Sequence, residues 1–287
     1  MDYSSDMQEN DTLASDPAMI RIYEKADLLA QRDASILIYG ESGVGKNHLA
    51  EYIQKKGAAP HAPFIHVYCN AVSDQLFASE LFGYTANAFT GASAKGKTGL
   101  LESAQNGTIL FDEINELSPE NQALLLHFLQ NRTITPIGAL TSREIHTRII
   151  ATSGRNLLDM IQEGSFRADL YYRLCVARIF IPPLRERREE IPMFIRHFIR
   201  LYEKEHGGGP HPISRSQMVK LCCLKWSGNL WEIKNLALRI CLADSTDDVV
   251  RQSPNLRSAA EQLGISYSSL CRKRAEYRAQ APDKKQP

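Results

Sequence analysis

The sequence predicts an α/β protein with a mostly parallel sheet covered by helices on both faces, followed by an all-helical unit. Two observations predict this fold. Up to residue 183, short apolar runs bounded by turn residues alternate with stretches of helical periodicity, which is typical of strand–helix–strand units. After residue 184, three helical stretches follow one another with no strand pattern between them.

The expected elements define four segments of the chain. The expected strands cover residues 35–39, 64–68, 108–111, 148–152 and 178–181. The expected helices cover 19–32, 46–55 and 118–130 in the first part, and 189–205, 214–225 and 229–242 in the second. The chain therefore divides into an acidic flexible tail (1–17), an α/β core (18–183), a helical subdomain (184–243) and a C-terminal unit with a basic tail (244–287).

The composition is that of a globular protein with no strong overall charge. The 287 residues are 43% hydrophobic and 23% charged, and the net charge of +1 indicates no class of partner. The C-terminal end differs, because residues 250–287 carry eight bases and three acids, which favours a local contact with a polyanion. The six cysteines form no CxxC pair, and no signal peptide or membrane-length apolar run is present, so we expect a cytoplasmic protein with free thiols and no membrane contact.

A glycine-rich motif joins the first expected strand to the next helix. Its residues are Gly40, Glu41, Ser42, Gly43, Val44, Gly45, Lys46 and Asn47. In this context the backbone N–H groups and the helix N-terminus bind phosphates, and Lys46 reaches the β- and γ-phosphates. The alternative, a chance glycine-rich turn, is disfavoured by the flanking strand and helix. The sequence therefore predicts an ATP site.

Two acids follow the third expected strand. We expect Asp112 to hold Mg²⁺ and Glu113 to orient the attacking water. Asn47 stands where the generic motif has a Ser or Thr hydroxyl for Mg²⁺, and it offers a neutral amide oxygen instead. Asn70, just after the second strand, is a candidate to bond Glu113 and hold it idle until the γ-phosphate binds. The alternative for Asn70 is an ordinary turn residue at a strand end.

Residues 17–243 resemble the AAA+ ATPase domain of bacterial enhancer-binding proteins, the activators of sigma-54 RNA polymerase. The motifs that carry the resemblance lie at 40–47, 80–83, 87–92, 107–114, 166–174, 182–187 and 226–229. The sharpest is Asn-Ala-Phe-Thr-Gly-Ala at 87–92, which looks like the GAFTGA loop confined to this class of ATPase. The resemblance implies an AAA+ P-loop core with an all-α lid, and it implies that Phe89, Thr90 and Gly91 contact sigma-54.

The resemblance also implies a ring. Arg167 and Arg173 match the family's arginine fingers, which reach the γ-phosphate of the neighbouring subunit, so hydrolysis depends on assembly into a hexamer. The alternative reading of both residues is surface arginines in salt bridges.

Several positions depart from the family pattern. Asn47 is one. Asn87 replaces the first glycine of the GAFTGA loop, although asparagine tolerates a left-handed backbone better than most residues. Gly154 follows Ser153 where the first sensor carries asparagine, and Trp231 stands where the second sensor carries arginine, with Lys234 one turn further on as a partial substitute. These changes bear on hydrolysis more than on binding.

The last segment has the spacing of a helix-turn-helix over residues 256–277, and it resembles the Fis-type DNA-binding domain. The candidate DNA contacts are Tyr267, Ser268, Ser269, Arg272, Lys273 and Arg274. A plain helical hairpin with a basic face is the alternative. Only about 17 residues precede the ATPase, where family members carry a regulatory domain, so we expect control by a separate protein acting in trans, by expression level or by assembly.

Three functions remain open. The first is a sigma-54-dependent activator that binds upstream double-stranded DNA and uses ATP hydrolysis in a ring to remodel the closed complex. The second is a DNA-binding regulator with a degenerate ATPase that binds nucleotide and turns it over weakly or not at all. The third, an AAA+ remodeller of another assembly such as a replication initiator, is disfavoured by the loop at 87–92.

Overall fold

The computed structural model describes residues 14–71, 73–206 and 210–242. The chain divides into two compact units, Met1–Pro183 and Leu184–Pro287. The division falls where strand patterns end in the sequence.

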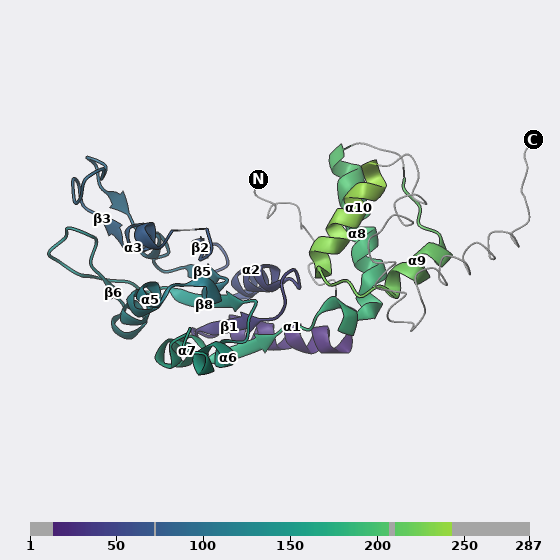
Figure 1. Ribbon diagram of the computed structural model, residues 1–287, viewed down its shortest axis with the longest axis horizontal. Coiled ribbons are helices and arrows are strands. Elements are labelled where there is room, and N and C mark those ends of the chain that lie inside the picture. Colours follow the sequence, from purple (N-terminus) through teal and green to yellow (C-terminus); the bar gives the residue numbers. More distant parts are fainter. Residues whose placement is uncertain (1–13, 72, 207–209, 243–287) are drawn as a thin grey trace, which may run out of the picture. The chain divides into compact units, whose positions relative to one another are not determined.

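The first unit is built on a five-stranded sheet in the order β2-β5-β8-β1-β9 (Figure 1). All four neighbouring pairs are parallel, as predicted. The strands are β1 (Ile36–Tyr39), β2 (Phe64–Tyr68), β5 (Thr108–Asp112), β8 (Arg148–Ser153) and β9 (Ala177–Phe180). The last strand lies one residue earlier than expected, because Pro182 follows Ile181 and has no N–H to continue a ladder.

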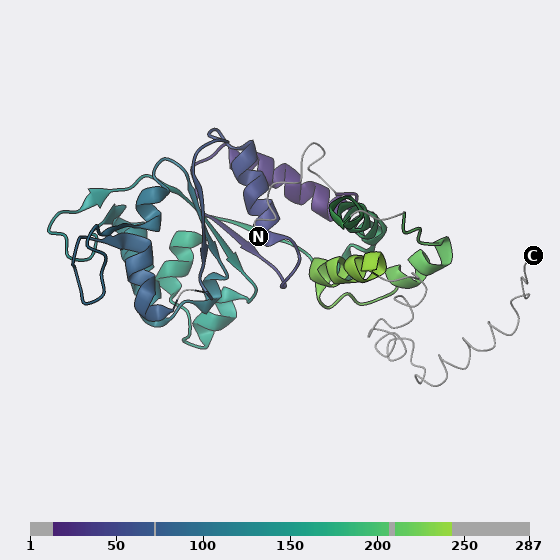
Figure 2. The ribbon, with the colours of Figure 1, turned by 90° about the horizontal axis from the view of Figure 1, so that it is seen from above.

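Alternation along the strands sends side chains into two separate cores. Ile36, Ile38 and Leu110 pack with α1 (Pro17–Ala30) and α2 (Lys46–Lys56) on one face. Their neighbours Leu37, Ile109 and Phe111 pack on the other face with α3 (Asp74–Phe82), α5 (Pro119–Asn131), α6 (Leu157–Gln162) and α7 (Ala168–Leu174). Figure 2 shows the sheet between these two helix layers. Helices on both faces were predicted, and the structure confirms them.

Helix starts follow the capping residues. The Asp16 side chain accepts from Ala18 N at 2.8 Å, so α1 begins at Pro17, two residues before the expected start. The Ser118 side chain accepts from Asn121 N in the same way, and α5 begins at Pro119. Proline occupies the first turn of both helices, where its missing N–H costs nothing.

Short elements connect the sheet to its exposed loops. Two-stranded hairpins are formed by β3 (Gly83–Tyr84) with β4 (Lys97–Thr98), and by β6 (Thr133–Ile134) with β7 (Arg143–Glu144). A four-residue helix, α4 (Leu100–Ser103), follows β4, and a 3-10 turn, η1 (Ile114–Glu116), follows β5. The β3–β4 hairpin carries residues 87–92 at its tip.

The second unit is helical. It contains two 3-10 turns, η2 (Leu184–Glu186) and η3 (Arg188–Glu190), and three helices, α8 (Ile191–His206), α9 (Arg215–Cys222) and α10 (Asn229–Leu242). The expected helix 214–225 ends early, because Trp226 turns into the left-handed region and its buried indole donates to Leu221 O at 2.9 Å. The expected helix 189–205 begins at Ile191, after η3, where a buried ion pair joins Arg187 and Glu190 at 3.0 Å.

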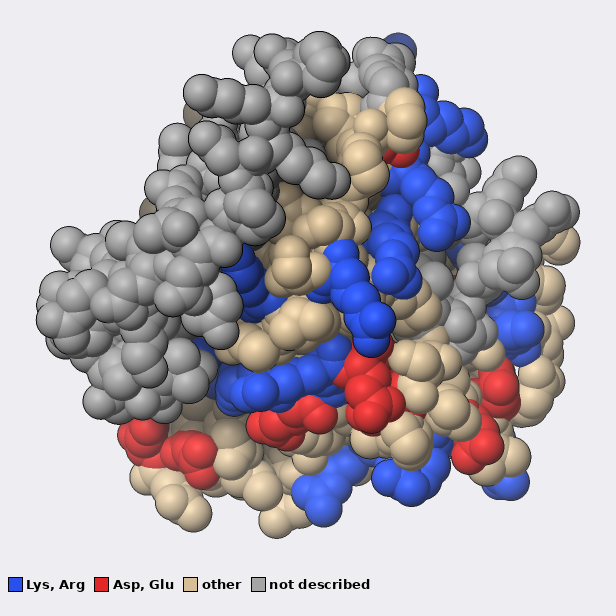
Figure 3. Space-filling view, turned by 90° about the vertical axis from the view of Figure 1, so that its right-hand side faces the viewer, with Lys and Arg blue, Asp and Glu red and all other residues tan. Residues whose placement is uncertain are grey.

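The helical unit is positively charged. Residues 184–242 carry eleven Lys or Arg and six Glu, and Figure 3 shows Lys and Arg gathered on this end of the molecule. Arg196, Arg200 and Lys204 lie exposed at four-residue spacing on α8, and none of them forms an ion pair within the described residues.

Two further features can be stated for the described part of the chain. All five cysteines in it are free thiols. None of its helices combines the length and the apolar character needed to cross a bilayer.

Candidate active site

The loop at 40–47 leaves the carboxyl end of β1 and leads directly into α2. Gly43 and Gly45 have φ of 77° and 104°, in the region that favours glycine. A Cβ on Gly40 would lie 2.5 Å from Ile181 O, so this position also requires glycine. The N-cap residue of α2 is Gly45, which makes no side-chain cap hydrogen bond, and the N-terminus of a helix favours an anion.

Lys46 is held inside this loop. Its side chain is 5% exposed, and its ammonium donates to Gly40 O at 3.1 Å and to Glu41 O at 3.3 Å. The same ammonium pairs with Glu113 Oε1 at 2.9 Å. The structure thus brings together the cation and the carboxylate that the sequence places in two separate motifs.

Glu113 is held at both oxygens. Oε1 pairs with Lys46, and Oε2 accepts from the backbone N–H of Gly154 at 2.8 Å. The residue itself has φ of 53°, and its own N–H donates to Thr152 Oγ1 at 3.0 Å. Asn70 is exposed, and within the described residues the contacts of the Glu113 carboxylate are Lys46 and Gly154 rather than Asn70. The role of Asn70 stays a prediction.

The first-sensor segment is organised by Asn115. Its Oδ1 accepts from Ser153 Oγ at 2.9 Å and from Gly154 N at 3.1 Å. A Cβ on Gly154 would lie 2.8 Å from Glu113 Oε2. The departure at Gly154 is therefore linked to the position of Glu113, since a side chain at residue 154 would make the Glu113 carboxylate shift from the position it holds here.

Asp112 is surrounded by hydrogen-bond donors. Its Oδ2 accepts from Asn47 Nδ2 at 2.8 Å, its Oδ1 accepts from Thr152 Oγ1, and His66 Nε2 lies 3.5 Å from Oδ2. Burial raises the pKa of Asp112, but the nearby His66 and the hydrogen bonds from Thr152 and Asn47 lower it by more, so the pKa lies below its ordinary value. The group is an anion at neutral pH.

Asp112 and Asn47 fit a divalent cation. Asn47 donates its NH₂ to Asp112, which leaves its Oδ1 buried without a hydrogen-bond partner. Oxygen donors of these two kinds are suitable ligands for Mg²⁺. Within the described residues no three His, Cys, Asp or Glu side chains cluster to hold a metal ion, so an ion here takes its other ligands from phosphate oxygens or water.

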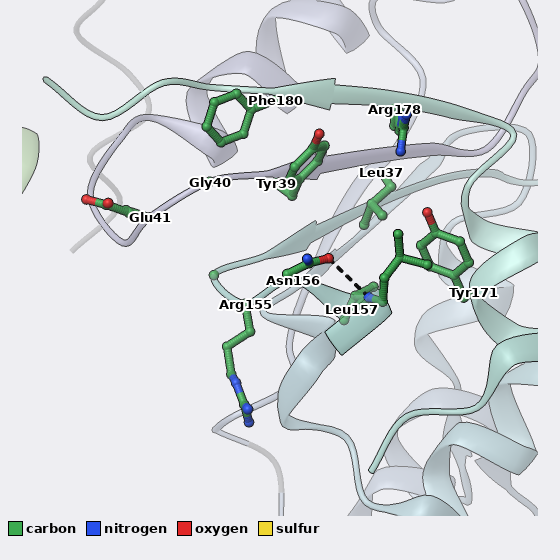
Figure 4. Close-up of a pocket in the computed structure, with 12 residues that line it drawn as sticks. Leu37, Tyr39, Gly40, Glu41, Arg155, Asn156, Leu157, Tyr171, Arg178 and Phe180 are labelled. Carbon is green, nitrogen blue, oxygen red and sulfur yellow. Dashed lines mark hydrogen bonds between the residues drawn. The ribbon is translucent and has the colours of Figure 1, made fainter. Parts of the chain in front are cut away.

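A hollow of about 400 Å³ adjoins the phosphate loop (Figure 4). Gly40 and Glu41 line one side of it, Gly154 and Arg155 another, and Tyr39, Tyr171 and Phe180 supply aromatic surface. The tyrosine and phenylalanine rings of residues 39 and 180 lie 5.2 Å apart. The hollow borders the Lys46–Glu113 pair but does not contain it.

The loop at 87–92 is exposed. Asn87 has φ of 55°, which confirms the expected left-handed turn. Phe89 is 43% exposed and its ring lies 5.1 Å from that of Tyr84, while Thr90 and Gly91 are exposed beside it. The β6–β7 loop supports this tip, because Thr85 N donates to Ile137 O at 2.9 Å.

The two candidate arginine fingers lie on or next to α7. Arg167 precedes the helix and forms a two-point contact with Asp169 at 2.8 and 3.0 Å. Arg173 is exposed in the last turn of the helix. Within the described residues, the side-chain contact of Arg167 is with Asp169 rather than with Lys46 or Glu113, and the finger role of the two arginines stays a prediction.

The sequence model of the Sigma-54 interaction domain matches residues 12–180. The match covers the phosphate loop, the 87–92 tip and both arginines. The chain belongs to the Sigma-54 interaction domain family.

The helical unit matches the AAA+ ATPase lid domain over residues 185–261. In this Sigma-54 interaction domain protein, Trp231 is 60% exposed on α10, and the Lys234 ammonium lies 4.9 Å from its ring. Burial lowers the pKa of Lys234. The second-sensor position thus carries an aromatic–cation pair in place of a free arginine.

Curated relatives and solved structures agree with this family. The chain is 41% identical over 81% of its length to the "Uncharacterized protein in HyuA 5'region" of Pseudomonas sp. strain NS671, of which it spans 78%. It is 43% identical over 72% of its length to the putative uric acid sigma-54-dependent transcriptional regulator UacR of Escherichia coli K12, of which it spans 35%. The crystal structure of NtrX from Brucella abortus in complex with ATP superposes with a TM-score of 0.75 at 26% identity, over 92% of this chain and 68% of NtrX.

Sequence reasoning missed three residues of the site, and it missed the backbone role of Gly154. Thr152, His66 and Asn115 contact Asp112 or the first sensor, and the Gly154 N–H holds Glu113. A polar residue in the middle of the apolar strand 64–68 was the available signal for His66. The helix-turn-helix contacts expected at 267–274 lie outside the described residues.

Proposed function

We propose that this protein is a sigma-54-dependent transcription activator that uses ATP hydrolysis to remodel the closed complex of sigma-54 RNA polymerase. The exposed tip at 87–92 carries the proposal. Phe89 and Thr90 present an apolar ring and a hydroxyl group at the tip of a hairpin. This hairpin belongs to the same folded unit as the phosphate loop. A conformational change caused by nucleotide hydrolysis can therefore be transmitted within one folded unit to a partner bound at the 87–92 tip.

ATP with Mg²⁺ is the proposed nucleotide. Support comes from the uncapped start of α2, the Lys46 ammonium between the loop carbonyls, and the anionic Asp112 beside an unpartnered Asn47 oxygen. When bound, Mg²⁺ neutralises charge that develops on the phosphates. Lys46 orients the γ-phosphate, and Glu113, once released from Lys46, accepts the proton of the attacking water. Asn70 stays a candidate partner of the released carboxylate.

Hydrolysis is proposed to require a second copy of the chain in a ring, as a hexamer. Arg173 is exposed, and the exposed Arg167 guanidinium pairs with Asp169 at the surface, so both side chains are accessible to a neighbouring site. An arginine supplied in trans is worth roughly 10³–10⁵ in rate in related nucleotide hydrolases.

Upstream double-stranded DNA is the proposed second ligand, with the contacts at 267–274 named above. The base-rich residues 250–287 support this, and so does the positive helical unit that precedes them. Phosphate contacts of this kind make binding depend steeply on salt.

The experiment that tests the activator is an ATPase titration against protein concentration, followed by an open-complex assay with purified sigma-54 polymerase. We expect activity per subunit to rise steeply with concentration. Arg173→Ala is expected to abolish it, whereas Arg143→Ala, another exposed arginine of the same unit, is a matched control that leaves it unchanged. Absence of open complexes at every concentration, with polymerase and DNA present, refutes the proposal.

The second candidate is a regulator that binds nucleotide with little turnover. The specific observation in its favour is the clamp on Glu113, whose two oxygens are engaged by Lys46 and Gly154. In that case nucleotide binding sets only the shape or assembly of the protein. A turnover rate that falls sharply in Glu113→Gln or Arg167→Ala refutes this candidate.

A further inference from the structure

Asp112 has two neighbours that are not part of a generic phosphate-loop site. Asn47 lies on α2 and His66 on β2, and both approach the same carboxylate oxygen, at 2.8 and 3.5 Å. One atom of each neighbour, Asn47 Oδ1 and His66 Nε2, is buried without a hydrogen-bond partner. A separation of 3.5 Å is too long for a good hydrogen bond between His66 and Asp112. Two donor atoms are therefore left unused beside one anion.

The fold fixes this arrangement. His66 pairs in register with Leu110, and alternation places Leu110 and Asp112 on the same face of β5, toward α2. The imidazole is held there by stacking on Tyr68, with ring centroids 3.9 Å apart and an interplanar angle of 27°. The position of His66 Nε2 beside Asp112 is therefore fixed by the sheet and not by a loop.

The geometry matches two ligands of one small cation. Neighbouring ligands of octahedral Mg²⁺ lie about 2.9 Å apart, because Mg²⁺ requires short ligand distances of about 2.0–2.1 Å. The observed 3.5 Å between His66 Nε2 and Asp112 Oδ2 is longer than this and leaves room for a cation larger than Mg²⁺. Imidazole nitrogen is also a ligand that first-row transition metals accept more readily than Mg²⁺ does.

We propose that Asp112, His66 and Asn47 form a mixed oxygen–nitrogen cation site that selects a divalent first-row transition-metal ion, such as Mn²⁺ or Co²⁺, over Mg²⁺. The inference rests on the proposed nucleotide site, because nucleotide phosphate oxygens and water complete the coordination. His66 is then a direct ligand and the specificity-determining residue, and Asn47 supplies an amide oxygen.

The test compares the affinities of Mn²⁺ and Mg²⁺ for the full chain with the non-hydrolysable ATP analogue AMP-PNP. His66→Phe keeps an aromatic ring on Tyr68 and removes the nitrogen, and His127→Phe on the exposed face of α5 is the matched control. We expect His66→Phe to lower the preference for Mn²⁺ over Mg²⁺ by roughly 10- to 100-fold. His127→Phe is expected to leave the preference unchanged.

A spectroscopic readout separates ligation from packing. With ¹⁵N-labelled protein and unlabelled AMP-PNP, pulsed electron paramagnetic resonance of bound Mn²⁺ is expected to show ¹⁵N coupling that disappears in His66→Phe. Equal metal preference in the wild type and His66→Phe, or absence of ¹⁵N coupling, overturns the inference while leaving nucleotide binding intact. Failure of AMP-PNP to bind with either ion or without metal overturns the nucleotide proposal as well.

Discussion

Replacing Glu113 with glutamine is expected to tighten ATP binding while removing turnover. In the nucleotide-free protein the Lys46 ammonium is paired with the Glu113 carboxylate at 2.9 Å, so the phosphates of ATP must compete for it. The substitution removes the competing charge, and it also removes an anion that repels the phosphates. Both effects act in the same direction on the dissociation constant.

The magnitude follows from the exposure of the pair. At 2.9 Å and an effective dielectric constant of about 20, the attraction is roughly 6 kcal/mol before desolvation is subtracted. Lys46 is 5% and Glu113 is 24% exposed, which places the pair between surface and buried ion pairs. A net value of about 1–2 kcal/mol is reasonable for such a pair, and it corresponds to roughly 5- to 30-fold tighter ATP binding.

The assay is a calorimetric or fluorescence titration with ATP, with phosphate release measured in parallel. Glu120→Gln, an exposed acid in the first turn of α5, removes the same charge without touching Lys46 and is the matched control. It is expected to leave affinity within twofold of the wild type. Unchanged or weaker ATP binding in Glu113→Gln would show that Glu113 does not compete with the phosphates of ATP for the Lys46 ammonium.

Three further predictions concern the scaffold. Glu190→Gln is expected to destabilise the helical unit in urea by about 3 kcal/mol, because it removes the charge that compensates a buried arginine, while exposed Glu189→Gln stays within about 0.5 kcal/mol. Gly138→Ala is expected to impair sigma-54 activation with ATPase intact, because its Cβ would lie 2.9 Å from that of Ala88 at φ of 82°. Gly164→Ala, at φ of 74° with open space around it, is expected to be active. Burial raises the pKa of the Cys69 thiol, and the neighbouring acids raise it further, so thiol-modification mass spectrometry at pH 8 is expected to find it protected while exposed cysteines react.

The strands and the phosphate loop were predictable because their signals are local. Residues 36–39 and 109–111 are continuous apolar runs, which is typical of strands buried on both faces, and the structure places both strands in the interior of the sheet, on either side of β8. The glycines of the phosphate loop indicate backbone conformations with positive φ, which few other residues adopt. The two-residue strands that carry the 87–92 tip were not predicted, since elements this short have no periodicity to detect.

The partners within the site were harder to predict because they join distant positions. His66 reaches Asp112 through the pairing of β2 with β5, and no pattern within either strand specifies that pairing. Asn47 was expected to face a metal with its oxygen, and the structure shows that its NH₂ group bonds Asp112, which leaves the oxygen free for that role. The C-terminal contacts and the function of both arginines stay predictions.

The departure at the first sensor and the clamp on Glu113 have one physical cause. With glycine at 154, the end of β8 donates its N–H to Glu113 Oε2 at 2.8 Å, and a Cβ there would lie 2.8 Å from the same oxygen, so the carboxylate would have to shift. Asn115 in turn binds both Ser153 and Gly154, so the end of β8 is tied to the turn that follows Glu113. A phosphate that draws Lys46 away leaves the carboxylate attached only to this backbone. In the proposed mechanism, the orientation of the Glu113 carboxylate toward the attacking water therefore depends on the position of β8. The backbone at the end of this strand takes the place of the family's side-chain sensor.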